Sequence, residues 1–78
     1  MRAIKEFEGK NIYVSLNTHS GKRRYSGKCI EVVFMGFEQD TEIFMITIID
    51  KFGFYVSFTN KEIEFIEVEK PKKVREDG

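Results

Sequence analysis

The chain is short of the residues from which several classes of protein are built. Its 78 residues include one cysteine, one proline and one histidine, and no tryptophan. Because a lone cysteine cannot form an internal disulfide, Cys29 is typical of a protein of the reducing cytoplasm, where we expect this chain to be located. Cys29 also has no other cysteine and no second histidine with which to hold a metal. We therefore predict a small apolar core residue, and neither a metal nor a cofactor.

Long apolar runs and an excess of one charge are also missing. No run approaches the roughly 20 apolar residues that cross a bilayer, and the N-terminal region has no apolar signal-peptide core, so we expect no membrane contact. The 13 basic residues balance the 13 acidic ones. Nucleic-acid-binding proteins usually carry a clear positive excess, so the overall charge gives no support to such a partner. Lys and Glu make up 19 of the 26 charged residues, a proportion typical of heat-adapted organisms.

The abundant residues favour β-structure. There are nine Ile, eight Phe, six Val and three Tyr, against a single Leu and a single Ala. Side chains that are aromatic or branched at Cβ fit a pleated sheet, whereas helices favour Ala and Leu. The length predicts one domain over residues 1–70, followed by a charged, solvated tail over residues 71–78. Because folding costs about 1.5 kcal/mol of conformational entropy per residue, so small a core is close to break-even alone, and oligomerisation is the natural stabiliser.

The pattern of apolar residues predicts the first elements. Helical spacing over residues 2–8 predicts one or two helical turns. Strict alternation over residues 11–16 predicts a strand whose buried face carries Ile12, Val14 and Leu16. Residues 17–22 are rich in turn formers and predict a loop. A long second strand is expected over residues 23–37, with a sharp bend or bulge at Gly27.

The rest of the chain predicts three further strands, over residues 43–50, 54–58 and 63–68. The expected turns lie at residues 36–42, at residues 51–53 and at Thr59-Asn60. The third of the five strands is apolar on both faces. We therefore expect a neighbour on its outer side, either the helix or another subunit.

Two segments carry a family resemblance. Gly9-Lys10-Asn11-Ile12-Tyr13-Val14-Ser15-Leu16 is similar to the Gly-Lys-x-Val-x-Val-x-Leu of the first strand of Sm-like (LSm) proteins. The segment over residues 54–67, two β-rich runs joined by a short turn, resembles the second signature of that family. One helix followed by five strands is also the family's order, and the chain looks like a divergent prokaryotic or archaeal-type member. The resemblance implies an Sm-like or SH3-like small barrel, five-stranded, antiparallel and strongly bent, with a short N-terminal helix.

The residues with which the family holds a uridine base are replaced. Its turn between the last two strands normally reads Ile-Arg-Gly, and the matching residues are Phe58, Thr59 and Asn60. The Asp and Asn of its first signature match Glu38 and Glu42 in one alignment, or Val33 and Phe37 in another. Thr59 lacks the Arg guanidinium, and an ionised Glu42 only accepts hydrogen bonds and repels phosphate. Asn60 is expected to keep the turn, because Asn tolerates the left-handed conformation. The resemblance thus implies degenerate nucleotide-pocket positions at Glu38, Glu42, Thr59 and Asn60.

Two further surfaces are candidates for binding. One basic cluster is a candidate RNA site, because arginine and tyrosine side chains together contact phosphate and stack on bases. It consists of Lys22, Arg23, Arg24 and Tyr25, with His19 close by. The alternative is a solvated loop. The segment over residues 34–40 combines Phe and Met with acidic residues, as protein interfaces do. The alternative there is ordinary core packing at the end of the barrel.

Catalysis is not expected. The one histidine, His19, has Ser20 beside it, but adjacent loop residues do not make a nucleophile–base pair. The sequence also contains no phosphate-binding loop and no dinucleotide fingerprint. The glutamates of the last strand are typical of a solubilised edge rather than of acid–base chemistry.

The resemblance implies assembly with copies of the same chain. In Sm-like proteins the fourth strand of one subunit pairs with the fifth strand of its neighbour, and neither strand contains proline here. We expect a homo-oligomer, a ring, with interface residues Tyr55, Val56, Phe58, Phe65 and Ile66. The alternative is that charged residues on these strands block edge pairing. Two functions follow: an oligomer that binds RNA through altered contacts, or a structural, protein-interacting oligomer that has lost nucleotide binding.

Overall fold

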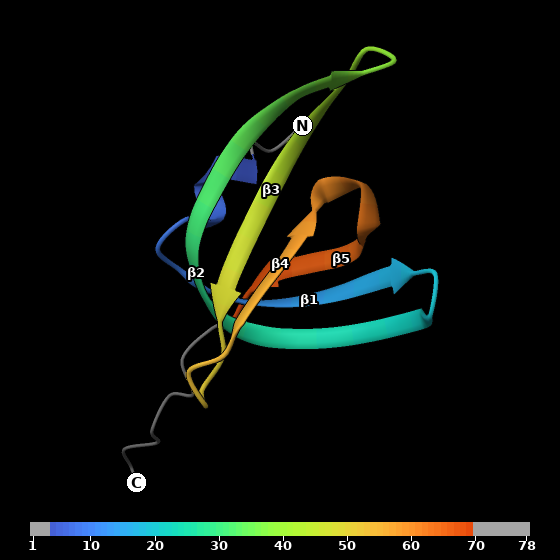
Figure 1. Cartoon of the computed structure of the whole chain (residues 1–78). Helices are drawn as coiled ribbons and strands as arrows, with labels where there is room; N and C mark the ends of the chain where they lie inside the picture. The colour runs from blue at the N-terminus through green and yellow to red at the C-terminus, as the bar shows by residue number, and fades with distance from the viewer. Residues whose placement is uncertain (1–3, 70–78) are drawn as a thin grey trace, which may run out of the picture.

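The computed structural model describes residues 4–69, and the described chain is all-β. Its strands form one antiparallel sheet in the order β4-β3-β2-β1-β5 (Figure 1). The elements are η1 (Ile4–Phe7), β1 (Asn11–Thr18), β2 (Gly21–Glu38), β3 (Thr41–Ile49), β4 (Tyr55–Thr59), η2 (Asn60–Glu62) and β5 (Ile63–Val68), where η denotes a 3₁₀ helix. The predicted all-β class and the five antiparallel strands are confirmed.

The predicted N-terminal helix is a single 3₁₀ turn within the described residues. The backbone N–H of Glu8 donates to the Lys5 carbonyl oxygen at 3.1 Å, a bond of the three-residue spacing that defines such a turn. Gly9 ends η1 with a φ of 87°, a conformation that glycine adopts without a Cβ penalty. Residues 2 and 3 of the predicted helix lie outside the described part of the chain.

Strand β2 is shared by the two halves of the sheet. Its first half pairs with β1 as far as Lys28, and from Lys28 onwards it pairs with β3. Figure 1 shows β2 curving strongly between these two partners. A Cβ atom at Gly27 would collide with the carbonyl oxygen of Ile49, so glycine allows the close approach where β2 changes partner. The predicted bend is therefore present at Gly27, while the register shift closest to it lies between Cys29 and Glu31.

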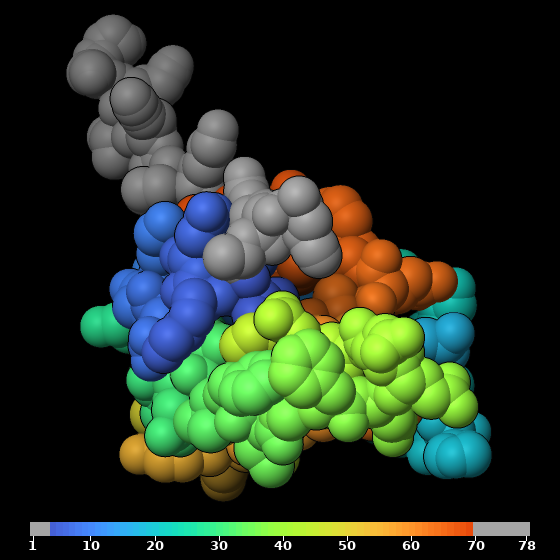
Figure 2. All heavy atoms as spheres, turned by 90° about the horizontal axis from the view of Figure 1, so that it is seen from above, coloured from blue at the N-terminus to red at the C-terminus, as the bar shows by residue number. Residues whose placement is uncertain are grey.

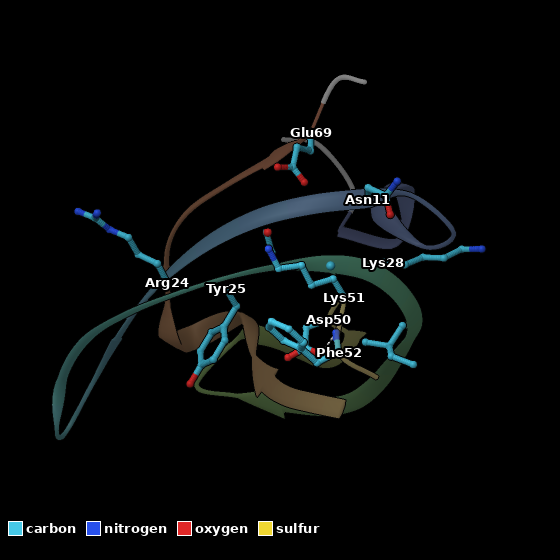
Figure 3. Close-up of a pocket in the computed structure, with 11 residues that line it drawn as sticks. Asn11, Arg24, Tyr25, Lys28, Asp50, Lys51, Phe52 and Glu69 are labelled. Atoms are coloured by element: carbon cyan, nitrogen blue, oxygen red, sulfur yellow. Dashed lines mark hydrogen bonds between the residues drawn. The ribbon is translucent and has the colours of Figure 1, made fainter. Parts of the chain in front are cut away.

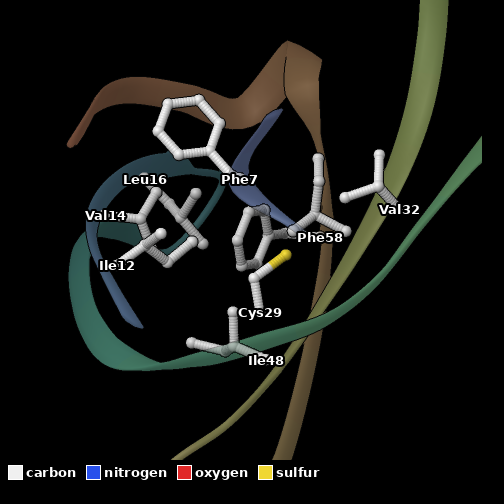
Figure 4. Packing of buried hydrophobic residues seen from close by; sticks show 9 residues of the cluster. Phe7, Ile12, Val14, Leu16, Cys29, Val32, Ile48 and Phe58 are labelled. Carbon is white, nitrogen blue, oxygen red and sulfur yellow. The ribbon is translucent and has the colours of Figure 1, made fainter. Parts of the chain in front are cut away.

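The bend folds the sheet around one core. The side chains of Ile12, Val14 and Leu16 on β1 face that of Ile48 on β3 (Figure 4), and Ile46 of β3 belongs to the same cluster. Phe7, Cys29, Val32 and Phe58 complete the buried cluster. Cys29 is 0% exposed, which agrees with its predicted role as a small apolar core residue. Burying each of the larger side chains stabilises the fold by about 1.5–3 kcal/mol.

The sheet is not closed into a barrel by the described residues. Among the described strands, β4 pairs only with β3, and β5 pairs only with β1. The connection between β4 and β5 is the 3₁₀ helix η2, which lies against β3 and β1, rather than a two-residue turn that would make them ladder partners. The sheet of residues 4–69 therefore has β4 and β5 as its two edges, and neither is paired on its outer side with another described strand.

Two of the predicted turns are wrong because they are too long. The loop expected over residues 17–22 is only His19-Ser20, and Thr18 pairs with Gly21. The turn expected over residues 36–42 is only Gln39-Asp40, whose φ angles of 50° and 71° suit a tight hairpin turn. Polar residues on the solvated face of a strand resemble loop residues in sequence, which explains both errors. The short connection over residues 51–53 is confirmed, with Gly53 at a φ of 89°.

Strand β3 is less buried than its sequence suggests. Ile46 and Ile48 are fully buried, but Met45 and Ile49 on the outer face are only half-buried.

None of the helices in the described part of the chain is long and apolar enough to cross a membrane. The predicted tail over residues 71–78 lies outside the described residues.

Candidate functional site

The outward-facing backbone groups of β4 are the first feature of interest. The N–H of Asp50 donates to the Phe54 carbonyl oxygen at 2.9 Å, which sets the phase of the β3–β4 ladder. Because residues of an antiparallel strand alternate between bonded and non-bonded pairs, the backbone groups of Val56 and Phe58 face β3. Those of Tyr55 and Ser57 face away from the sheet. The edge ends at Thr59, whose N–H donates to the Glu62 side chain at 3.1 Å.

Strand β5 offers the complementary edge. The N–H of Glu69 donates to the Asn11 carbonyl oxygen at 2.8 Å, so the backbone groups of Phe65 and Glu67 face β1 by the same alternation. The backbone groups of Ile66 and Val68 then face away from the sheet. Each edge thus presents alternate N–H and C=O groups that bond to no other described strand.

The predicted interface residues divide into two kinds. Tyr55 is 68% exposed and Phe65 is exposed, whereas Val56 and Ile66 are half-buried. Phe58 is 3% exposed, so its side chain has little surface left to offer a neighbouring copy. Its side chain belongs to the core because β4 directs every second residue inward.

The four degenerate pocket positions lie at one end of the molecule, where their groups are used by the fold. The Asn60 side chain accepts a hydrogen bond from the Phe44 N–H at 2.8 Å and donates to the Glu42 carbonyl oxygen at 2.9 Å. Its amide thus continues the β3–β4 ladder by one step. Glu38 forms an ion pair with Lys61. The backbone of Thr59 is capped by Glu62, as described above.

Asn60 also does not adopt the left-handed conformation expected for it. Among the described residues other than glycine, only Gln39 and Asp40 have positive φ. Asn60 instead begins a 3₁₀ turn and acts through its side chain. Beside it lies a hollow of about 850 Å³ whose apolar lining is Ile4, Phe37, Phe44, Ile63 and Ile66. Both polar groups of this amide thus bond to the backbone, which fixes the orientation of the side chain at this end of the molecule.

The predicted basic cluster is split by the pleat of β2. Arg23 and Tyr25 lie opposite Leu16 and Val14 and share their face of the sheet, whereas Lys22 and Arg24 share the other face. Lys22 forms an ion pair with Glu64 at 2.9 Å. His19 lies in the tight turn between β1 and β2. The cluster therefore does not form one patch, and only Arg24 and Tyr25 reach a common hollow.

That hollow, here called the basic hollow, is completed by residues that the sequence did not single out. Lys28 of β2 joins Arg24 and Tyr25, and Lys51 and Phe52 enter from the β3–β4 connection (Figure 3). Its volume is about 640 Å³, and its remaining lining residues are Asn11, Ser26, Gly27, Ile49, Asp50 and Glu69. Lys28 pairs with Ile49 in the β2–β3 ladder, which brings the connection alongside β2. No local pattern could have joined residues so far apart in sequence.

The geometry of the basic hollow combines cations with flat rings. Phe52 is 74% exposed, and the Lys51 Nζ lies 5.5 Å from the centroid of its ring. Asp50 accepts hydrogen bonds from the N–H groups of Phe52 and Phe54 through one carboxylate oxygen, at 2.9 Å each. These bonds hold the connection in place. They also engage one oxygen of the Asp50 carboxylate, which is the negative group next to Lys51 in the sequence. In Figure 3 Arg24 and Lys28 extend in opposite directions from the hollow. Such a set of groups suits a ligand that carries both phosphates and aromatic rings.

No group of three or more histidine, cysteine or acidic side chains in residues 4–69 is placed to hold a metal ion. Burial raises the pKa of the Cys29 thiol, and the nearby Glu8 carboxylate adds to this effect, while a backbone hydrogen bond with Glu31 opposes it.

Comparison of the chain with known protein families, with characterised proteins and with solved structures finds no match. The Sm-like resemblance therefore rests on the sequence motifs and on the order of the strands.

Proposed function

We propose that the chain is an Sm-like subunit that assembles with copies of itself, β4 of one copy pairing with β5 of the next. The observation that carries the proposal is the pair of free edges at the two ends of the described sheet. The strand order, the strong bend of β2 and the 3₁₀ turn between β4 and β5 support an Sm-like fold. A neighbouring subunit would continue the sheet where the single chain leaves it open.

The composition of the edges supports pairing between copies. Strand β4 contains no charged residue and no proline, and both are devices by which natural edge strands avoid partners. Strands β4 and β5 have five and six residues, so their ladders are of matching length. Exposed Tyr55 and Phe65 add apolar area that pairing would remove from water. Because the two edges differ, the contact is head-to-tail and generates a ring when the rotation closes.

The test replaces an edge N–H without disturbing the β3–β4 ladder. Ser57→Pro removes a donor that faces away from the sheet, and proline is tolerated on edge strands. Ser57→Ala is the matched control, because both variants lose the hydrogen bond between the Ser57 and Thr47 hydroxyls at 2.9 Å. Light scattering is expected to show an oligomer for the unmodified chain and for Ser57→Ala, and a folded monomer for Ser57→Pro. A monomeric unmodified chain at micromolar concentrations would refute the proposal.

The oligomer is further proposed to bind single-stranded RNA in the basic hollow, with phosphates near Arg24, Lys28 and Lys51 and bases stacked on Tyr25 and Phe52. Binding is expected to fall steeply with salt and to show little preference for uridine, because phosphate contacts are screened and carry no sequence information. Lys28→Gln should weaken binding more than Lys22→Gln, which removes the same charge outside the hollow. Equal effects of the two variants would exclude the hollow as the site.

A second candidate function is a structural, protein-interacting oligomer without RNA. It is favoured by the contacts of Asn60 and Glu38, whose side chains at the usual base-binding end bond to the fold itself. The two functions differ in one measurement. Absence of RNA binding at low salt, with the oligomer intact, supports the second candidate.

A further inference from the structure

The tip of the β2–β3 hairpin is an exposed surface that neither assembly through the edges nor RNA binding explains. Phe34, Met35 and Phe37 are exposed there, Phe37 to 67%. The rings of Phe34 and Phe37 are in edge-to-face contact with centroids 5.5 Å apart, and the ring centroid of Phe44 lies 5.3 Å from that of Phe34. Figure 2, seen from above, looks onto this hairpin. Apolar side chains gathered in this way indicate an interaction site.

The same tip is acidic. Glu38, Asp40 and Glu42 lie at this tip, and of these three only Glu38 forms an ion pair with a described residue, Lys61. An acidic surface repels the phosphates of RNA and of anionic lipids, so neither is a suitable occupant. A suitable partner combines cationic groups with exposed rings.

The basic hollow has that chemistry. Lys51 lines it together with the carboxylates of Asp50 and Glu69, and Arg24 and Lys28 extend outward from its two sides. One Asp50 oxygen already accepts two backbone hydrogen bonds. Tyr25 and Phe52 supply rings on which Phe37 can pack. A carboxylate next to a phenyl ring offers the same pair of contacts as a phosphate next to a base.

The tip and the basic hollow lie at opposite ends of β3 (Figure 1). The nine residues of this strand span roughly 30 Å, so one chain cannot bring its own tip to its own hollow. Contact between the two surfaces therefore requires two copies. It uses neither the β4 edge nor the β5 edge, so it can occur between assembled rings.

We propose that the acidic aromatic tip of one copy docks in the basic hollow of a second copy. The contact is head-to-tail and stacks copies, or rings of copies, into an open array. Because RNA would use the same cations and rings, RNA and the tip compete for the hollow. The docking itself does not depend on RNA binding.

The test uses two charge variants of the full chain, purified free of nucleic acid as judged by absorbance. The tip variant is Asp40→Asn with Glu42→Lys, and the hollow variant is Lys28→Glu with Lys51→Glu. All four positions are exposed, and Asn tolerates the positive φ of residue 40, so both variants are expected to fold, which circular dichroism checks. Sedimentation velocity is run at 0.1 M and 1 M salt, where charges are screened over about 10 Å and about 3 Å.

The unmodified chain is expected to form particles of at least about twofold greater mass at 0.1 M than at 1 M salt. Each variant alone should keep the smaller size at both salts. An equimolar mixture should regain the larger size, because the tip of each variant then complements the hollow of the other. Equal particle size of the unmodified chain at both salts, or a mixture no larger than its components, would overturn the docking. In 1 M salt the mass of each variant reports edge assembly separately, so failure of one proposal is not mistaken for failure of the other.

Discussion

Replacing Asn60 by alanine removes a side chain that bonds to the backbone of two β3 residues. The Phe44 N–H loses its acceptor and the Glu42 carbonyl loses its donor. A hydrogen bond contributes about 0.5–1.5 kcal/mol, and a donor left without a partner costs about 1–3 kcal/mol. Water reaches the Glu42 oxygen, which is exposed, more easily than the Phe44 N–H, which is part-buried. We therefore expect Asn60→Ala to lower the free energy of unfolding by about 2 kcal/mol.

The assay is thermal and urea unfolding followed by circular dichroism at one fixed protein concentration. For a domain of this size, 2 kcal/mol corresponds to a fall in Tm of roughly 10 °C. Asn60→Asp is the matched control, because a carboxylate still accepts from the Phe44 N–H but faces the Glu42 carbonyl without a proton to donate. It should fall between alanine and the unmodified chain. A loss below about 0.5 kcal/mol for Asn60→Ala would refute the view that this amide continues the ladder.

Two further predictions concern the core and the bend. Gly27→Ala should destabilise the fold by about 1–3 kcal/mol or more in urea unfolding, because its Cβ meets the Ile49 carbonyl; an unchanged midpoint would show that β2 and β3 separate easily. Cys29 should resist alkylation in the folded protein and react on unfolding, because it is fully buried and burial raises the pKa of its thiol. Since the unfolded thiol ionises at lower pH than the folded one, the contribution of Cys29 to stability should fall as the pH rises above the ordinary pKa of a thiol. Rapid alkylation under native conditions would contradict this.

The β-content and the buried face of β1 could be predicted because they depend on local alternation. The alternation of Ile12, Val14 and Leu16 with more polar residues indicates a half-buried strand without reference to the rest of the chain. Gly27 could be assigned to a bend because a glycine within a strand usually marks a close approach.

Features set by contacts between distant segments could not be predicted. The role of Asn60 depends on a ladder with β3, and the basic hollow depends on Lys28 lying beside the β3–β4 connection. Which backbone N–H groups of β4 face outward could not be predicted either. Val56 lies centrally in β4, yet its N–H faces β3, while that of Ser57 faces outward. The sequence of a strand does not show which of its backbone N–H and C=O groups form hydrogen bonds with the neighbour on each side.

The central claim is that β4 and β5 pair between copies, and amide hydrogen exchange tests it residue by residue. The N–H groups of Ser57 and Ile66 face away from the sheet of a single chain, whereas those of Val56 and Phe65 are bonded within it. Pairing between copies predicts slow exchange at all four positions. Fast exchange at Ser57 and Ile66, with Val56 and Phe65 still protected, would contradict the account.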